Sequence, residues 1–309
     1  MTLVKPQAIL DNLQLVIQGK SEQLELLLIS ILAGGHALLE DVPGVGKTTL
    51  AKALAKTFDG DFRRIQFTPD LLPTDILGSS IYSPKTGEFN FKAGPIFSHV
   101  VLADEINRAS PRTQSALLEA MSEGQVTTEG TTATLPDPFL VIATQNPVEF
   151  HGTYPLPEAQ LDRFLVRFSM GYPDSESELK MLQGQRASHP LNSLKPVATF
   201  EQLRQLRAKV SEVNVSDDVT RYILGIIGRT RSDARLKLGS SPRGSLAIYK
   251  ACQARAYMQG RDFVTPDDVK TMAKPVLAHR MILETKTRYS GETSESIMDE
   301  HLNALPVPA

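Results

Sequence analysis

The chain has 309 residues, of which 41% are hydrophobic and 22% are charged, and its formal net charge is -2. This balance is that of a globular protein and gives no sign of nucleic acid or an anionic membrane as an obligatory partner. A single cysteine, Cys252, cannot form an intrachain disulfide or a thiolate zinc site alone, which fits a reducing compartment. The N-terminus has no signal-peptide core and no apolar run is long enough to insert into a membrane, so we expect a cytoplasmic protein.

The first half of the chain predicts alternating helices and strands. Apolar periodicity predicts helices over 8–18, 21–33, 47–58 and 110–123. Short apolar runs predict strands over 37–39, 63–67, 99–103, 139–144 and 164–168. The continuous apolar runs among them are typical of strands covered on both faces, so the pattern predicts a doubly wound α/β domain with a parallel sheet.

Two β-hairpins are predicted within this alternation. Residues 81–91 have a turn around Pro84 to Gly87, and the threonine-rich residues 125–135 turn at Glu129 and Gly130.

Helix signals dominate after about residue 170. They predict helices over 199–213, 216–231, 242–259 and 266–282, the last one opened by Thr265 and Pro266. We therefore divide the chain into an α/β domain at 1–187, a proline-containing linker at 188–198, a small all-α domain at 199–289, and a polar tail at 290–309 that we expect to dock loosely.

A glycine-rich turn between the strand at 37–39 and the helix at 47–58 predicts a P-loop. Gly44 and Gly46 allow backbone N–H groups to wrap phosphate oxygens, Lys47 would reach the β- and γ-phosphates of ATP, and the Thr48 hydroxyl would bind Mg²⁺. Asp41 stands where the pattern normally opens with glycine, and aspartate tolerates left-handed backbone conformations better than most residues. The nucleotide contacts predicted in this loop are Pro43, Gly44, Val45, Gly46, Lys47, Thr48 and Thr49.

Two carboxylates follow the next buried strand, as in a Walker B motif. Asp104 would hold Mg²⁺ through water, and Glu105 would orient and polarise the water that attacks the γ-phosphate. An aspartate and a glutamate together favour hydrolysis over phosphoryl transfer to another acceptor.

With these two motifs the sequence resembles the AAA+ ATPases. Residues 139–147 look like the sensor 1 strand, in which Asn146 would hold the attacking water or the γ-phosphate. Residues 156–164 look like the segment that carries an arginine finger, so Arg163 would reach the neighbouring subunit's site. Residues 239–243 resemble sensor 2, with Arg243 on the γ-phosphate of its own subunit. Residues 17–20 resemble the stretch that packs on adenine, which adds Ile17 and Gly19 to the nucleotide contacts.

Within AAA+, the segments 66–73, 94–97, 104–109 and 152–158 resemble the MoxR family. This resemblance implies a P-loop α/β domain followed by an all-α lid, a ring expected to be a hexamer, and chaperone-like action on protein clients. It also implies a separate partner with a von Willebrand factor A domain, and hairpins that face the central pore. The role of Arg108 stays open between the site and mere packing beside it.

Three other functions fit the sequence less well. A nucleic-acid motor is disfavoured by the net charge, the absence of tryptophan and the lack of lysine or arginine in 125–135, although Lys85 and Lys92 flank the other hairpin. A nucleotide switch without turnover would not need Glu105, Asn146 and Arg163. A small-molecule kinase would need an acceptor site, for which the sequence offers no candidate.

Overall fold

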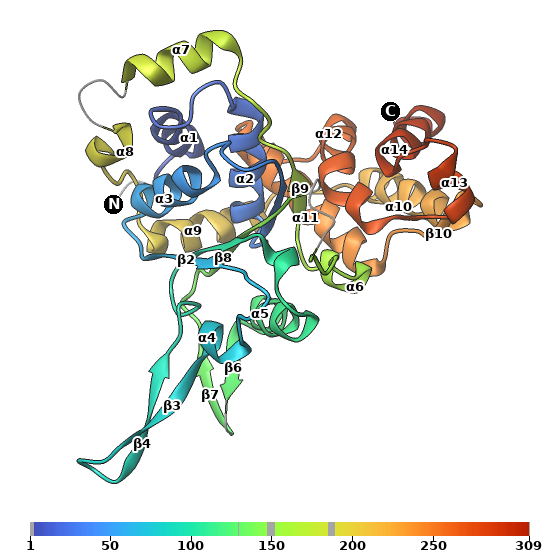
Figure 1. Ribbon diagram of the computed structural model, residues 1–309. Helices are drawn as coiled ribbons and strands as arrows, with labels where there is room; N and C mark the ends of the chain where they lie inside the picture. Colours follow the sequence, from blue (N-terminus) through green and yellow to red (C-terminus); the bar gives the residue numbers. More distant parts are fainter. Residues whose placement is uncertain (1–2, 129, 147–151, 185–188, 309) are drawn as a thin grey trace. The chain divides into compact units, whose positions relative to one another are not determined.

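The computed structural model describes residues 3–128, 130–146, 152–184 and 189–308, which Figure 1 shows as a ribbon. They form two compact units. The first comprises Met1–Glu25, His36–Leu156 and Phe168–Arg204, and the second comprises Leu26–Gly35, Pro157–Arg167 and Gln205–Ala309.

The central sheet has five strands in the order β2-β5-β8-β1-β9. The pairs β2–β5, β5–β8 and β1–β8 are parallel, which confirms the prediction. All five predicted strands are present, with ends shifted by one or two residues. Their bounds are Ala37–Glu40 for β1, Phe62–Gln66 for β2, Val100–Asp104 for β5, Leu140–Gln145 for β8 and Val166–Phe168 for β9.

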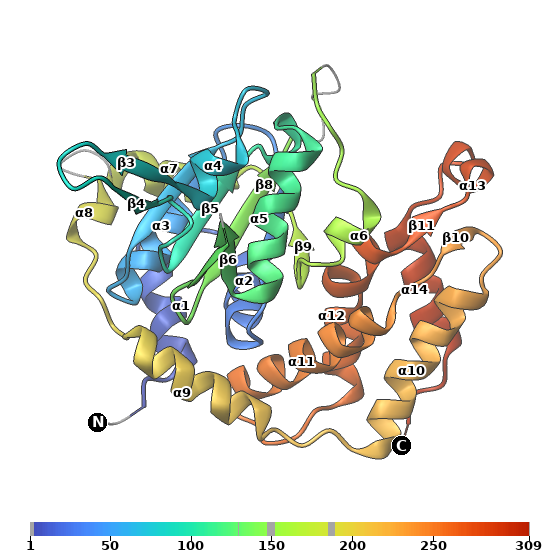
Figure 2. The ribbon, with the colours of Figure 1, turned by 90° about the horizontal axis from the view of Figure 1, so that it is seen from below.

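Helices cover both faces of this sheet, as a doubly wound fold requires. α3 (Lys47–Thr57) leads from β1 to β2, and α5 (Pro111–Glu123) leads from β5 back to β8. Parallel crossovers are right-handed as a rule, and these two run in opposite directions across the sheet, which places the two helices on opposite faces. Figure 2 shows them on the two sides of β5 and β8. β5 is buried along its whole length and β8 up to its last residue.

Capping residues set the ends of α5 as predicted. The hydroxyl of Ser110 accepts the Thr113 N–H at 3.4 Å, and Gly124 ends the helix with a φ of +63°.

The first predicted helix ends earlier than expected. α1 (Pro6–Gln14) stops before residue 18, and α2 (Ser21–Leu32) follows after a short turn. Asn12 fastens α1 to α3 by donating from Nδ2 to the Thr57 hydroxyl at 3.0 Å. The turn that follows α1 lines a pocket.

Both predicted hairpins are present, and in Figure 1 both extend away from the sheet. β3 (Gly78–Ser83) pairs antiparallel with β4 (Glu88–Ala93) after the short α4 (Pro73–Leu77), and β6 (Gln125–Thr128) pairs with β7 (Thr131–Thr134). Glu129, predicted in the second turn, lies outside the described residues. The first hairpin carries exposed apolar side chains, including Tyr82 and Phe89, whose ring centroids are 5.4 Å apart.

The second unit is mainly helical, as predicted. Its long helices are α10 (Asp217–Ser232), α11 (Pro242–Met258), α12 (Pro266–Leu277) and α14 (Ser294–Ala304), with α9 (Phe200–Ser211) leading into it. Thr265 and Asp268 form a capping box at the start of α12. That helix ends before residue 282, since Ala278–Arg280 form a 3-10 turn and β11 (Ile282–Leu283) pairs with β10 (Leu236–Leu238).

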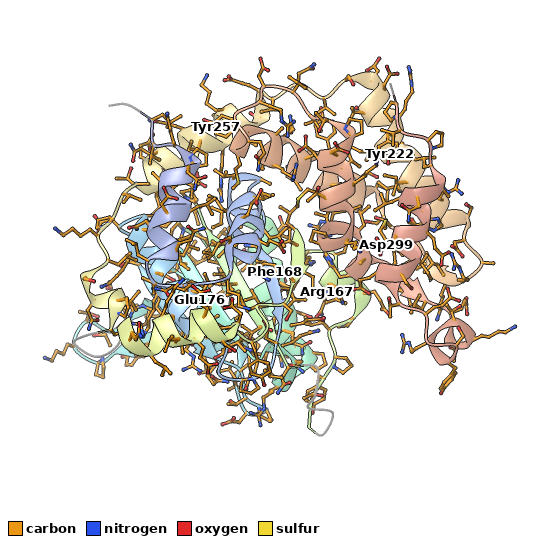
Figure 3. All side chains as sticks on the ribbon, turned by 90° about the horizontal axis from the view of Figure 1, so that it is seen from above. Arg167, Phe168, Glu176, Tyr222, Tyr257 and Asp299 are labelled. Atoms are coloured by element: carbon orange, nitrogen blue, oxygen red, sulfur yellow. The ribbon has the colours of Figure 1, made fainter. Side chains whose placement is uncertain are left out.

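The expectation of a loosely docked tail is wrong for residues 294–304. These residues form α14, in which Ile297 and Met298 are fully buried, and Lys274 of α12 forms a 2.7 Å ion pair with Asp299, which is labelled in Figure 3. The apolar residues that anchor this helix are few and lie between polar residues, so the sequence did not indicate a buried helix. α13 (Thr285–Tyr289) precedes it.

The predicted linker also contains structure. α7 (Ser175–Gly184) lies before it and α8 (Pro190–Ser193) within it, whereas Ser188 lies outside the described residues. Among the residues that the structure describes, none of the helices has the length and apolar character that a membrane span requires.

We expect Ile297→Ala to lower the free energy of unfolding of the second unit by about 2–5 kcal/mol, because it leaves a cavity where the side chain is 0% exposed. Urea unfolding followed by circular dichroism measures this change. Leu224→Ala on α10 is the matched control, since Leu224 is 52% exposed and its loss should change stability by no more than about 0.5 kcal/mol. Equal, small effects of both substitutions would mean that α14 is not part of the core.

Candidate functional site

The glycine-rich loop at residues 41–46 connects β1 to α3. Gly44 and Gly46 have φ angles of +91° and +90°, which glycine adopts without strain. A Cβ atom at either position would meet no atom within 4 Å, so backbone conformation and not space requires glycine. α3 begins at Lys47, and the first N–H groups of a helix have no partner within it, which favours an anion at this end. The Lys47 side chain is 9% exposed and its Nζ donates to the carbonyl oxygen of Asp41 at 3.2 Å.

Asp41 is buried, and its carboxylate holds the segment that follows β9. It accepts hydrogen bonds from the Ser169 hydroxyl at 2.6 Å and from the N–H groups of Met170 and Gly171 at 2.7 and 2.9 Å. Among the described residues, the non-glycine residues with a positive φ do not include Asp41. The interpretation that aspartate stands here for its backbone tolerance is therefore wrong, because its side chain is what the structure uses.

The parallel register brings three strand ends to one edge of the sheet. The N–H of Asp41, after β1, donates to the carbonyl oxygen of Gln145 at the end of β8, at 3.2 Å. β8 in turn is in register with β5, which ends at Asp104. Asn146 follows β8 and is 6% exposed. The loop before α3, Asp104 and Asn146 therefore share this edge, whereas Pro147 lies outside the described residues.

The carboxylate of Asp104 is held from two neighbouring strands. The Thr144 hydroxyl of β8 donates to Oδ1 at 2.7 Å, and Arg64 of β2 donates to Oδ2 from Nη2 at 2.6 Å and from Nε at 3.1 Å. Thr48 adds a hydroxyl in the first turn of α3. A carboxylate and a hydroxyl are hard oxygen donors of the kind that Mg²⁺ prefers, so these residues fit that ion.

Glu105 has a left-handed backbone, with φ +56° and ψ +50°. Its N–H donates to the Thr144 hydroxyl at 2.9 Å, and its Oε2 accepts from Gln66 Nε2 at 2.8 Å and from Arg108 Nη1 at 3.1 Å. Two donors from different elements thus fix the carboxylate. Arg108, whose role was left open, lies against Glu105 in this arrangement.

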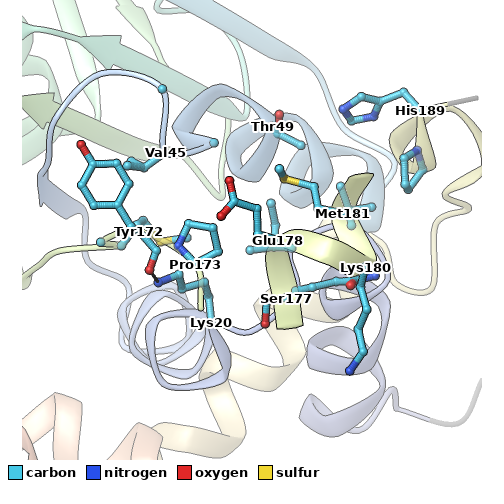
Figure 4. A pocket seen from close by; sticks show the side chains of 18 residues that line it. Lys20, Val45, Thr49, Tyr172, Pro173, Ser177, Glu178, Lys180, Met181 and His189 are labelled. Carbon is cyan, nitrogen blue, oxygen red and sulfur yellow. Dashed lines mark hydrogen bonds between the residues drawn. The ribbon is translucent and has the colours of Figure 1, made fainter. Parts of the chain in front are cut away.

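A pocket of about 320 Å³ borders the glycine-rich loop, a size suited to a small-molecule ligand (Figure 4). It is lined by residues from four places: the turn after α1, the loop and start of α3, the segment 170–173, and α7 with the start of α8. Lys20 donates from Nζ to the carbonyl oxygen of Tyr172 at 2.7 Å and so joins two of these segments. Figure 4 shows Tyr172, Pro173, Glu178 and Met181 among the side chains that line it.

Only some of the predicted nucleotide contacts line this pocket. Those that line the pocket are Ile17, Gly44, Val45, Gly46 and Thr49. Pro43, Lys47 and Thr48 do not line it but lie in the adjoining loop and first helical turn.

Gly19 does not line the pocket either. Its φ is +68°, and a Cβ there would lie 2.1 Å from the Ser177 hydroxyl oxygen. Its role in the structure is the close approach of the turn after α1 to α7.

Arg163 and Arg243 lie in the second unit. Arg163 follows the short α6 (Glu158–Leu161) and is partly exposed, and Arg243 is the second residue of α11 and is exposed. Their segments touch, because the Ser241 hydroxyl donates to Oδ2 of Asp162 at 3.0 Å.

Sequence reasoning missed several side chains of this site. Arg64 and Gln66 are two apart on β2 and so lie on the same face of the sheet, and both contact the acidic pair of the neighbouring strand. The sequence offered one signal for these two residues, which is an arginine and a glutamine two positions apart near the end of a predicted strand. The pocket residues between 170 and 190 gave none, because only the fold brings them to the loop.

Two family models match the chain. Residues 36–166 match the ATPase family associated with various cellular activities (AAA), and residues 228–301 match the AAA lid domain.

The chain is also similar to proteins that match it over most of their length. It is 52% identical to YeaC of Bacillus subtilis over 96% of this chain and 93% of that protein. It is 39% identical to Chaperone MoxR1 of Mycobacterium tuberculosis, over 95% of this chain and 80% of that protein, and 31% identical to Protein MoxR of Paracoccus denitrificans, over 95% and 94%. A crystal structure of a protein from Cytophaga hutchinsonii matches with a TM-score of 0.91 at 39% identity, over 98% of this chain and 94% of that one.

We expect Asp41→Gly, which restores the usual opening glycine, to weaken ATP binding by about tenfold or more. It removes three hydrogen bonds to a buried carboxylate, each worth about 1.5–3 kcal/mol in such settings, and about 1.4 kcal/mol suffices for a tenfold change. Titration with a fluorescent ATP analogue measures the dissociation constant.

Asp59→Gly is the matched control. Asp59 is exposed and has a φ of +52°, so glycine relieves backbone strain there and should leave affinity unchanged. Native affinity in Asp41→Gly would show that position 41 matters only for its backbone.

Proposed function

This chain belongs to the MoxR family of AAA+ ATPases, and on that premise we propose that it hydrolyses ATP in a self-assembled cytoplasmic ring and uses the cycle to remodel or mature protein clients.

The nucleotide is held by the loop before α3 and by the pocket beside it. The base lies in the pocket against Ile17 and the segment 170–173, and the phosphates lie at the start of α3, where Lys47 contacts the β- and γ-phosphates. Thr48 and Asp104 would hold Mg²⁺. Bound there, the ion would neutralise the negative charge that develops on the phosphate oxygens.

The observation that carries the proposal is the placement of Glu105. Its carboxylate lies at the same sheet edge as the phosphate loop, and Gln66 and Arg108 both donate to Oε2. This leaves a fixed carboxylate to orient a water molecule and accept its proton as the water attacks the γ-phosphate. Asn146, buried at the neighbouring strand end, holds the same water or the γ-phosphate.

Two arginines complete the site. Arg163 reaches the nucleotide of the neighbouring subunit, and Arg243 contacts the γ-phosphate. A cation at the γ-phosphate lowers the barrier, because negative charge spreads over its oxygens as the bond breaks. An arginine supplied by a neighbour makes hydrolysis depend on a head-to-tail interface, which closes into a ring, here a hexamer.

The two hairpins are better suited to contact a protein client than a nucleic acid. Residues 125–135 contain no lysine or arginine to follow a phosphate backbone, and the β3–β4 hairpin exposes Tyr82 and Phe89. The relative from Mycobacterium tuberculosis is named a chaperone. A protein with a von Willebrand factor A domain acts as the separate partner.

We expect Glu105→Gln to bind ATP but to lower kcat by about 10²–10⁴, because the base is lost. Arg163→Ala should lower kcat by about 10³ or more. Steady-state phosphate release against protein concentration measures both, and the rate per native subunit should rise with concentration as rings assemble.

Mixing the two inactive variants then tests whether Arg163 acts across the interface. In an equimolar mixture, about a quarter of the interfaces combine an intact Glu105 with an intact Arg163 from the neighbour, so activity should return. Glu105→Gln mixed with the double variant is the control that cannot recover. Full activity of Arg163→Ala alone would refute the proposed mechanism.

A further inference from the structure

The segments that carry Arg163 and Arg243 meet at a single carboxylate in the second unit. Asp162 accepts from the Ser241 hydroxyl with Oδ2 at 3.0 Å and from Arg280 Nε with Oδ1 at 2.8 Å. Ser241 is also the N-cap of α11, since its hydroxyl accepts the Gly244 N–H at 3.2 Å. The residue before Arg163 is therefore bonded directly to the cap of the helix that begins with Pro242 and Arg243.

Arg280 fixes the other side of this junction. Its side chain is only 2% exposed, and besides Asp162 it donates to the carbonyl oxygens of Phe164 at 2.6 Å, Leu165 at 3.3 Å and Val276. One guanidinium thus holds the backbone on the C-terminal side of Arg163 to the end of α12. The planar fork of arginine suits such a set of acceptors, and lysine could not reproduce it.

The burial of Arg280 has an electrostatic consequence. Loss of solvent lowers its pKa to about 10, the Asp162 carboxylate opposes this, and the charge of Arg243 adds to the lowering. Arg243 therefore lies close enough to the junction for its charge to affect the pKa of Arg280. A buried cation with one carboxylate partner also makes removal of either group disruptive, so a gentler substitution is needed as a test.

We propose that Asp162 and Arg280 are positioning residues that hold the Arg163 segment and the start of α11 in one fixed arrangement, so that the positions of Arg163 and Arg243 are fixed relative to each other. The catalytic role of the two arginines in this inference rests on the proposed function. The fixed arrangement of their segments can be tested independently of that function. Catalytic arginines must be placed closely, since a displacement of about 1 Å can lower a rate about 10²-fold.

Spin labels at Arg163→Cys and Arg243→Cys test the arrangement in the full chain. The native Cys252 can remain, because it is 0% exposed and burial raises the pKa of its thiol, so the labels react with the introduced cysteines. Pulsed electron paramagnetic resonance should give a narrow distribution of distances between the two labels in this background. We expect Ser241→Ala to broaden it at least about twofold, with Asp162→Asn as a second variant acting on the same contact.

Ser216→Ala is the matched control, because Ser216 caps α10 in the same way, accepting the Val219 N–H at 3.3 Å, but does not contact Asp162. In protein with both arginines intact, Ser241→Ala should lower kcat about tenfold or more and change the KM for ATP much less, since the pocket lies in the first unit. Ser241→Thr keeps the hydroxyl and should retain the native kcat, as should Ser216→Ala.

The inference would be overturned if the distance distributions in Ser241→Ala and Asp162→Asn were as narrow as in the Ser216→Ala control. An unchanged kcat in Ser241→Ala would also overturn it. A failure of the proposed function looks different. In that case Arg163→Ala keeps its activity, while the label distances still decide whether the Asp162–Arg280 pair fixes the two segments.

Discussion

The hydroxyl group of Thr144 ties together the two acidic residues on which the site depends. It is fully buried in β8, donates to Asp104 and accepts the N–H of Glu105, so one atom sets the position of a carboxylate and the backbone of the next residue. It can do so only because β8 and β5 are parallel and in register. Their carboxyl ends therefore meet, and the loop before α3 reaches the same edge through β1. The whole chemical arrangement of the first unit follows from this pairing.

Much of the fold was readable in the sequence because its signals are local. Apolar runs marked the five strands, Ser110 and Gly124 marked the ends of α5, and Gly44 and Gly46 marked the loop that turns into α3. The parts that were missed depend on distant residues. α14 is held by burial of Ile297 and Met298 against α10 and α12, and the segment 170–173 reaches the pocket only because Asp41 binds it. Asp41 itself was assigned the wrong role, since sequence shows a residue type but not the partners of its side chain.

Asp41 and Asp162 use the same physical device in the two units. Each is a carboxylate that accepts hydrogen bonds with both oxygens from segments far away in the chain, one joining the glycine-rich loop to residues 169–171 and the other joining the Arg163 segment to α11 and Arg280. A carboxylate is well suited to this task, because charge-assisted bonds are short and about twice as strong as neutral ones. Neither residue needs to contact a nucleotide itself in order to fix the position of the residues for which we propose such a contact.

The left-handed backbone of Glu105 places backbone stability and the presence of a carboxylate in conflict at one position. At φ +56° a glutamate is strained, whereas glycine would be relaxed, and asparagine more nearly so. A search for more stable variants should therefore select replacements of Glu105 repeatedly, and each gain would remove the carboxylate that Gln66 and Arg108 hold in place. The glutamate side chain thus costs backbone stability at a position where it supplies a held carboxylate.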